Sequence, residues 1–162
     1  MTGPAERTVA ALRERGRRIA TAESLTGGLL CSTLVDVPGA SDVVAGAVVA
    51  YDPSVKTGLL GVDPAVVERY GTVDERTARA MAEAALRRVD GATVAVSTTG
   101  VAGPDPSEGH PAGTVFVAVA DAEGTVAQRL DLTGDRRAIR EATVRAALSL
   151  VVARLGEESR GQ

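Results

Sequence analysis

The sequence predicts an α/β protein, a single-domain layered α/β/α sandwich with a mixed β-sheet. The chain has 162 residues and a mass of 16.5 kDa, which suits one domain of ordinary size. Segments with apolar residues at helical spacing alternate with short β-rich apolar runs. A Glu123-Gly124 turn between two such runs predicts one antiparallel hairpin. We therefore expect one domain over residues 1–162, with its core at about residues 5–155.

In the first half of the chain, apolar spacing and turn residues define the expected elements. Residues 6–18 have the pattern of an amphipathic helix, and residues 19–22 that of a short strand. Small polar residues follow, and helical spacing resumes at 29–35. A β-rich run at 43–50 predicts another strand, and we expect a loop at 52–56.

The second half begins with two helices. Asp63-Pro64 has the pattern of an N-cap followed by proline at the first helical position, so a short helix is expected up to about Gly71. A longer amphipathic helix is expected at 74–89. The predicted strands are 92–96, 114–120 and 126–132. A helix at 135–154 closes the domain, and we expect a frayed end from residue 156.

Composition excludes several classes of function. A net charge of −3 and an aromatic content of 2% do not suit a nucleic-acid-binding surface. No apolar run approaches the roughly 20 residues that span a bilayer. The first 18 residues carry Glu6 and Glu14 among arginines, unlike a signal peptide. We therefore expect a cytoplasmic protein without nucleic-acid or membrane partners.

The cysteine and histidine content gives the same picture. Cys31 is the only cysteine, which excludes an internal disulfide and suits a reducing compartment. With His110 as the only histidine, a zinc site of the usual Cys/His type within one chain is excluded as well. This composition leaves a carboxylate-bound Mg²⁺ open, but no motif marks one, and we expect no metal site.

Lys56 is the only lysine among 18 Lys and Arg residues. Arginine is never deprotonated in a protein, whereas a desolvated lysine can lose its proton near neutral pH and act as a general base. A required neutral amine would explain why arginine does not replace it here. The alternative is a solvated loop lysine that survived a coding bias by accident.

Ser24 lies where a strand gives way to a helix, and two roles compete for it. Serine is a favoured N-cap residue. A serine at a helix N-terminus can instead be a nucleophile, with backbone N–H groups near Thr26, Gly27 and Gly28 stabilising an oxyanion. Its base would be Lys56 rather than His110, which lies in a Pro/Gly loop, because serine–lysine pairs are an accepted catalytic variant.

Three further features suggest a ligand site. Tyr51 lies five residues before Lys56 and could orient the lysine or relay its proton, or simply pack at the rim. The segment 97–104 reads as a strand end opening into a glycine-rich loop, a usual ligand position in α/β sheets. Near the start of the last helix, three arginines could bind a phosphate or remain solvated: Arg136, Arg137 and Arg140.

Several motifs together resemble the CinA C-terminal domain family, whose characterised activity is nicotinamide mononucleotide (NMN) amidohydrolase, also called NMN deamidase. The matching segments are TAES-x-TGG at 21–28, the Tyr51 to Lys56 spacing, TGVAGP at 99–104, GTV at 113–115 and GDR at 134–136. The resemblance covers about residues 5–155.

The resemblance implies a role for each site residue. Ser24 would be the nucleophile, Lys56 its general base and Tyr51 a supporting hydroxyl. The substrate-binding positions would be Thr26, Gly27, Gly28, Thr99, Gly100 and Arg140. It also implies a homodimer, and a stand-alone form without the N-terminal nucleotide-processing domain of the longer proteins.

The expected reaction is hydrolysis of the NMN carboxamide to nicotinic acid mononucleotide and ammonia, which requires no metal or organic cofactor. Two alternatives remain open: a pyridine-nucleotide-binding sensor without turnover, and a serine amidase for another small amide. The sensor has some support from departures from the family pattern. The chain has Tyr51-Asp52-Pro53 where Tyr-Ser-Asn is common, and His110 in the loop 105–110 where lysine is frequent.

Overall fold

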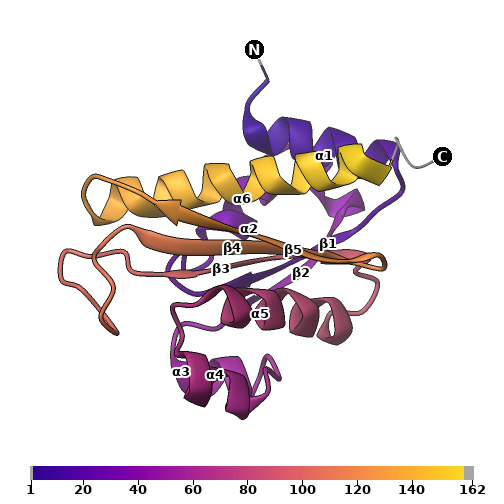
Figure 1. The fold of residues 1–162 in the computed structure, drawn as a ribbon. Helices are drawn as coiled ribbons and strands as arrows, with labels where there is room; N and C mark the ends of the chain where they lie inside the picture. The colour runs from indigo at the N-terminus through magenta and orange to yellow at the C-terminus, as the bar shows by residue number, and fades with distance from the viewer. Residues whose placement is uncertain (1, 159–162) are drawn as a thin grey trace.

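Strands and helices alternate along the chain and form three layers (Figure 1). The computed structural model describes residues 2–158. The strands are β1 (Ile19–Glu23), β2 (Val44–Val49), β3 (Val94–Gly100), β4 (Thr114–Asp121) and β5 (Gly124–Asp131). The helices are α1 (Pro4–Glu14), α2 (Leu29–Val35), α3 (Pro53–Thr57), α4 (Pro64–Tyr70), α5 (Glu75–Arg88) and α6 (Arg136–Glu158), with a 3-10 turn η1 (Ala40–Asp42).

The five strands form one mixed sheet in the order β2-β1-β3-β4-β5. Strand β1 is parallel to both β2 and β3, whereas β3–β4 and β4–β5 are antiparallel pairs. The carboxyl ends of β1, β2 and β3 therefore meet at one edge of the sheet, beside the start of β4. This edge is where α/β sheets usually bind ligands. The predicted α/β/α sandwich with a mixed sheet is confirmed.

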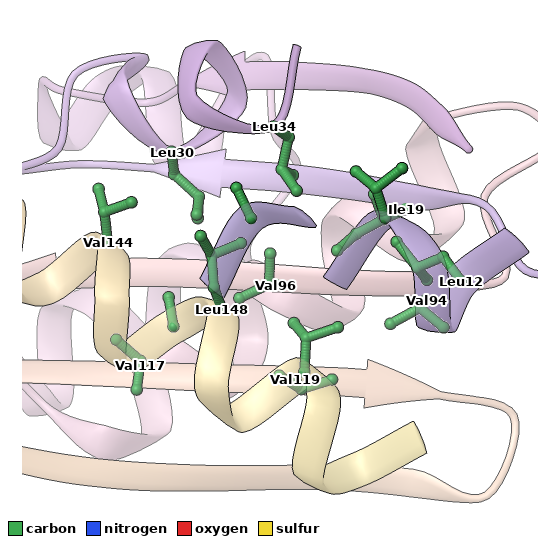
Figure 2. Close-up of a cluster of buried hydrophobic side chains, with 14 of the residues drawn as sticks. Leu12, Ile19, Leu30, Leu34, Val94, Val96, Val117, Val119, Val144 and Leu148 are labelled. Atoms are coloured by element: carbon green, nitrogen blue, oxygen red, sulfur yellow. The ribbon is translucent and has the colours of Figure 1, made fainter. Parts of the chain in front are cut away.

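Helices cover both faces of the sheet, with α1, α2 and α6 on one side and α3, α4 and α5 on the other (Figure 1). On the first side, leucines of the helices pack onto valines of β3 and β4 (Figure 2). On the second side, α5 presents mainly alanines to alanines of β1 and β3. Strands β3 and β4 are buried almost throughout because both of their faces are covered.

Two expected boundaries were wrong near the ligand edge. The predicted loop at 52–56 contains helix α3, which Asp52 caps by accepting from the Ser54 amide, with Pro53 in its first turn. Strand β3 continues to Gly100 instead of ending at residue 96, because the polar run pairs with β4 as far as Val115. Both differences extend ordered structure into the segments that carry polar side chains.

Helices lie near both ends of the described residues. Helix α1 ends at Glu14, short of the predicted residue 18, and Gly16 follows with a left-handed φ of 61°. Helix α6 continues through Glu158, so residues 156–158 are not frayed, and the rest of the predicted frayed end lies outside the described residues. Within residues 2–158 we find no helix that has both the length and the apolar character to cross a membrane.

Candidate active site

The amine of Lys56 lies against the hydroxyl of Ser24, with 3.0 Å between Nζ and Oγ. Lys56 is only 1% exposed and Ser24 only 8%. Helix α3 delivers the lysine: its Asp52 cap fixes the start of the helix, and Lys56 in its last turn points back to the end of β1. The alternative of a solvated loop lysine is therefore wrong.

Burial shifts the amine of Lys56 toward its neutral form. Burial lowers the pKa of Lys56 to about 8, although the negative charges of Asp52 and Glu108 act in the opposite direction. Nζ also donates to the main-chain carbonyls of Ala50 (2.8 Å) and Tyr51 (3.2 Å). A neutral amine has two N–H groups, which these carbonyls accept, so its lone pair is left facing Ser24. The geometry is that of a base poised to take the serine proton.

Ser24 occupies a turn, not a helix cap. Its amide donates to the Thr98 carbonyl, and its own carbonyl accepts from the Gly27 amide. The N-cap of α2 is Gly28, and Gly27 and Gly28 both have left-handed φ values that suit glycine. The N-cap interpretation of Ser24 is wrong, since its hydroxyl is engaged by Lys56.

The backbone N–H groups near the serine fall into two sets. Those of Leu30 and Cys31, at the start of α2, donate to the buried carboxylate of Glu23. Those of Leu25 and Thr26 donate to no acceptor among residues 2–158. The amides that remain available next to Ser24 are therefore those of the turn itself.

A pocket of about 410 Å³ opens beside the two residues at the carboxyl edge of the sheet. Its wall combines the β1 turn, α3, the segment before α5, the loop after β3 and the start of α6. The lining residues are Ser24, Leu25, Tyr51, Pro53, Lys56, Thr72, Val73, Thr99, Gly100, Val101, Ala102, Gly103, Pro104, Asp105, Ser107 and Arg136. A small-molecule substrate is of a size to enter such a space.

The sequence matches the family model described as "CinA C-terminal domain" over residues 2–155. The chain belongs to this family. Among curated relatives, the "CinA-like protein" of Frankia casuarinae is 47% identical over 140 residues, which are 86% of this chain and 32% of the relative. The "putative competence-damage inducible protein" of Geobacillus kaustophilus is 48% identical over 141 residues, 86% of this chain and 34% of the relative. The chain spans about a third of the length of these two relatives.

Solved structures of the CinA superfamily have the same fold. The competence/damage inducible protein CihA from Agrobacterium tumefaciens matches with a TM-score of 0.89 and 36% identity, covering 94% of this chain and 93% of that one. A CinA superfamily protein from Klebsiella pneumoniae matches with a TM-score of 0.90 and 31% identity, covering 96% of this chain and 99% of that one.

In this CinA C-terminal domain, the hydroxyl of Tyr51 bonds to Arg136 and not to Lys56, contrary to the expectation that it orients the lysine. The phenol is 57% exposed, and its oxygen accepts from Arg136 at 2.9 Å. Arg136 also donates to the Gly103 carbonyl at 2.5 Å, so it joins both sides of the pocket mouth. The side chain of Tyr51 lines the pocket, and Tyr51 contacts Lys56 only through its main-chain carbonyl, which accepts from Nζ.

The other predicted binding residues are divided between the pocket and its support. Thr99 and Gly100 line the pocket, and the Thr99 hydroxyl donates to the Thr72 carbonyl at 2.6 Å. Arg140 does not line it. Its guanidinium donates to the carbonyls of Leu25 and Thr26 and braces the serine turn from outside.

Thr26, Gly27 and Gly28 do not line the pocket either. The hydroxyl of Thr26 is buried against Glu23 and Thr98. Arg137, the remaining arginine of the predicted cluster, pairs with Glu141 on the exposed face of α6. Residues 26–28 therefore hold the turn in place and do not contact the pocket.

Sequence reasoning missed two acidic residues near the pocket. Glu23 is fully buried although glutamate is usually exposed, and its place inside a strand of small residues was the available signal. Glu108 accepts from the amides of Thr72 and Val73 and thereby fixes the loop 105–110 beside the pocket. No pattern of spacing connects residue 108 with residues 72 and 73. Among residues 2–158, no group of three or more His, Cys, Asp or Glu side chains is arranged to hold a metal ion.

Proposed function

We propose that this CinA C-terminal domain hydrolyses the carboxamide of nicotinamide mononucleotide to nicotinic acid mononucleotide and ammonia. Ser24 is the nucleophile and Lys56 the general base. The observation that carries the proposal is the 3.0 Å contact between the Ser24 hydroxyl and a buried amine whose pKa burial lowers to about 8. An amine with this pKa is partly neutral at physiological pH and can accept the serine proton.

The reaction follows from these groups in two halves. Lys56 Nζ takes the Ser24 proton while Oγ bonds to the amide carbon, and the resulting oxyanion accepts from the amide of Leu25, which lines the pocket. The protonated amine then gives its proton to the leaving nitrogen, and the C–N bond breaks to release ammonia. Water attacks the acyl-serine while Lys56 takes its proton, and that proton returns to Ser24 as the acid product leaves.

The pocket supports a polar nucleotide substrate. Arg136 and Tyr51 form a polar group at its mouth, where a phosphate would find charge-assisted donors. The amides of Ala102 and Gly103, in the glycine-rich loop, donate to no acceptor among residues 2–158. Both residues line the pocket, so their amides are further candidate donors to the substrate.

The deciding experiment measures ammonia release from NMN by the wild type, Lys56→Arg and Ser24→Ala, with folding checked by thermal melting. We expect both variants to fold and to lose at least about 100-fold in kcat, the usual scale for a general base or nucleophile. Arginine retains the positive charge but supplies no neutral amine. An Arg variant as active as the wild type would refute the Ser24–Lys56 mechanism.

The same assay separates the two alternatives. Binding of NMN without ammonia release by the wild type would favour a pyridine-nucleotide sensor. Ammonia release from other small amides but not from NMN would favour a different amidase. The homodimer remains a prediction, which sedimentation equilibrium of the purified chain would test.

A further inference from the structure

The carboxylate of Glu23 is fully buried beside the proposed nucleophile and accepts four hydrogen bonds. Oε1 accepts from the Thr26 hydroxyl at 2.8 Å and the Leu30 amide at 2.8 Å. Oε2 accepts from the Thr21 hydroxyl at 3.0 Å and the Cys31 amide at 3.0 Å. Each oxygen thus receives one hydroxyl and one backbone N–H group.

No cation of residues 2–158 pairs with this carboxylate. A buried charge without a cationic partner costs free energy unless hydrogen bonds replace its water, and four donors fill the usual capacity of a carboxylate. An apolar residue here would leave the amides of Leu30 and Cys31 and two threonine hydroxyls without this acceptor, so the carboxylate and its four donors require one another. Its position between the end of β1 and the start of α2 indicates another role.

Glu23 and Ser24 are neighbours that point to opposite faces of the sheet. The Glu23 side chain faces α2, whereas the Ser24 side chain faces Lys56 on the side of α3. Glu23 therefore does not touch the pocket. It reaches the serine through the main chain, because its carboxylate holds Thr26 inside the turn 24–28 and the amides of Leu30 and Cys31 just after it.

The hydrogen bonds continue into the neighbouring strands. Thr26 donates to Glu23, so the 2.8 Å contact between the Thr26 and Thr98 hydroxyls has Thr98 as the donor. The carbonyl of Thr98 accepts from the Ser24 amide, and the carbonyl of Glu23 accepts from the Ala50 amide. Ala50 in turn holds the Lys56 amine through its own carbonyl. One residue is thus linked to the supports of both Ser24 and Lys56.

We infer that Glu23 is a positioning residue that sets the separation of Ser24 Oγ from Lys56 Nζ by fixing the turn 24–28 to β1, α2 and β3. This inference rests on the proposed Ser24–Lys56 chemistry but not on NMN as the substrate. The carboxylate is required in this position because every one of its neighbours is a donor.

Glu23→Gln is the sharpest variant. Whichever way its amide is turned, the NH₂ group faces the N–H of either Leu30 or Cys31, so one donor meets another. We expect the turn to shift and kcat for NMN to fall by about 100-fold, as a displacement of about 1 Å can cost that much. KM should stay within about threefold, because no substrate contact is removed.

Thr21→Val is a milder second variant in case the Gln variant folds poorly. It removes one donor and keeps the carboxylate, and we expect a loss of about tenfold in kcat, as is usual for groups that orient an active residue. Thr8→Val is the matched control. Thr8 is also fully buried, but its hydroxyl bonds to carbonyls of Pro4 and Leu148 in the α1–α6 contact. It should lower the melting temperature without changing kcat.

A substrate-independent readout separates this inference from the proposed function. Diisopropyl fluorophosphate phosphorylates an activated serine, and intact-mass spectrometry follows the rate. We expect Ser24 to be labelled much more slowly in Glu23→Gln than in wild type or Thr8→Val. Labelling of Glu23→Gln at the wild-type rate would overturn the inference and leave the proposed function standing. If the wild type is labelled rapidly but does not hydrolyse NMN, and Glu23→Gln is labelled more slowly, the inference stands and the proposed function is overturned.

If the wild type reacts with neither reagent, crystal structures of wild type and Glu23→Gln decide the matter. A Ser24 Oγ–Lys56 Nζ distance longer than a hydrogen bond in the variant supports the positioning role. An unchanged 3.0 Å distance contradicts it.

Discussion

A single buried lysine determines most of the chemistry at the residue scale. The neutral amine has a defined orientation because two carbonyls take its N–H groups, which leaves one direction for the lone pair. Residue type made Ser24 and Lys56 candidates, but it was the family resemblance that selected them over an N-cap serine and a solvated lysine. The partner of the Tyr51 phenol was not predictable, since the sequence does not say whether a residue acts through its side chain or its carbonyl.

Burial of Lys56 should also make stability depend on pH. The pKa of Lys56 is about 8 in the folded chain and 10.5 for an unperturbed lysine. Below pH 8 the amine is protonated in both the folded and the unfolded state, and the folded state bears the full free-energy cost of burying the charge. Between the two values the unfolded chain binds more protons, so stability rises with pH by a total on the order of 3 kcal/mol.

Lys56→Met removes this titration. We expect the free energy of unfolding of the wild type, measured in urea from pH 7 to 10.5, to rise relative to that of Lys56→Met. A constant difference between the two proteins across this range would mean that the amine titrates alike in both states.

At the scale of elements, helix α3 follows strand β2 and places the side chain of Lys56 against Ser24. The sequence predicted a loop here because five residues are too few for periodicity to be visible, although the Asp52-Pro53 pair is a helix-start signal. The same limit applies to β3, whose polar carboxyl half is buried only because β4 and α5 cover it. Long amphipathic segments such as α5 and α6 were predictable, since their own spacing determines the buried face.

The cap of α3 also tunes the base. The negative charge of Asp52 raises the pKa of Lys56, so Asp52→Asn should lower it while the asparagine oxygen still caps the helix. Because the neutral amine is the active form in the proposed mechanism, the acidic limb of the kcat profile should move to lower pH. Asp63→Asn is the control, as Asp63 caps α4 in the same way by accepting from the Ala65 amide. A limb that moves to higher pH, or moves equally in both variants, would contradict this assignment.

On the scale of the whole molecule, the proposed site and one strong stabilising contact lie at opposite ends of β4. Thr114 begins the strand at the pocket edge, and Asp121 ends it at the other. There Asp121 accepts from Arg154 of α6 through both oxygens, at 2.6 and 2.9 Å, and this hydrogen bonding is the main cause of its lowered pKa. The contact fastens the end of α6 to the sheet.

We expect Asp121→Asn to lower the free energy of unfolding by about 2–3 kcal/mol at pH 7, the range for charged hydrogen bonds, with kcat unchanged. The pKa of Asp121 is lower in the folded state, so its contribution is present above the ordinary carboxyl pKa and is lost as pH falls through the lowered value. Urea titrations at pH 7 and pH 3 would test this. A difference that grows on acidification would be the opposite of the expected sign.

The enclosure of Lys56 also affects how protons are exchanged with the buffer. The amine is 1% exposed and faces Ser24 and two carbonyls, so a substrate in the pocket closes its remaining route to water. In the proposed reaction, a proton taken from Ser24 would then stay on Lys56 until the departing nitrogen accepts it. The acylation half-reaction would run on an internally recycled proton, and its rate would be independent of buffer concentration.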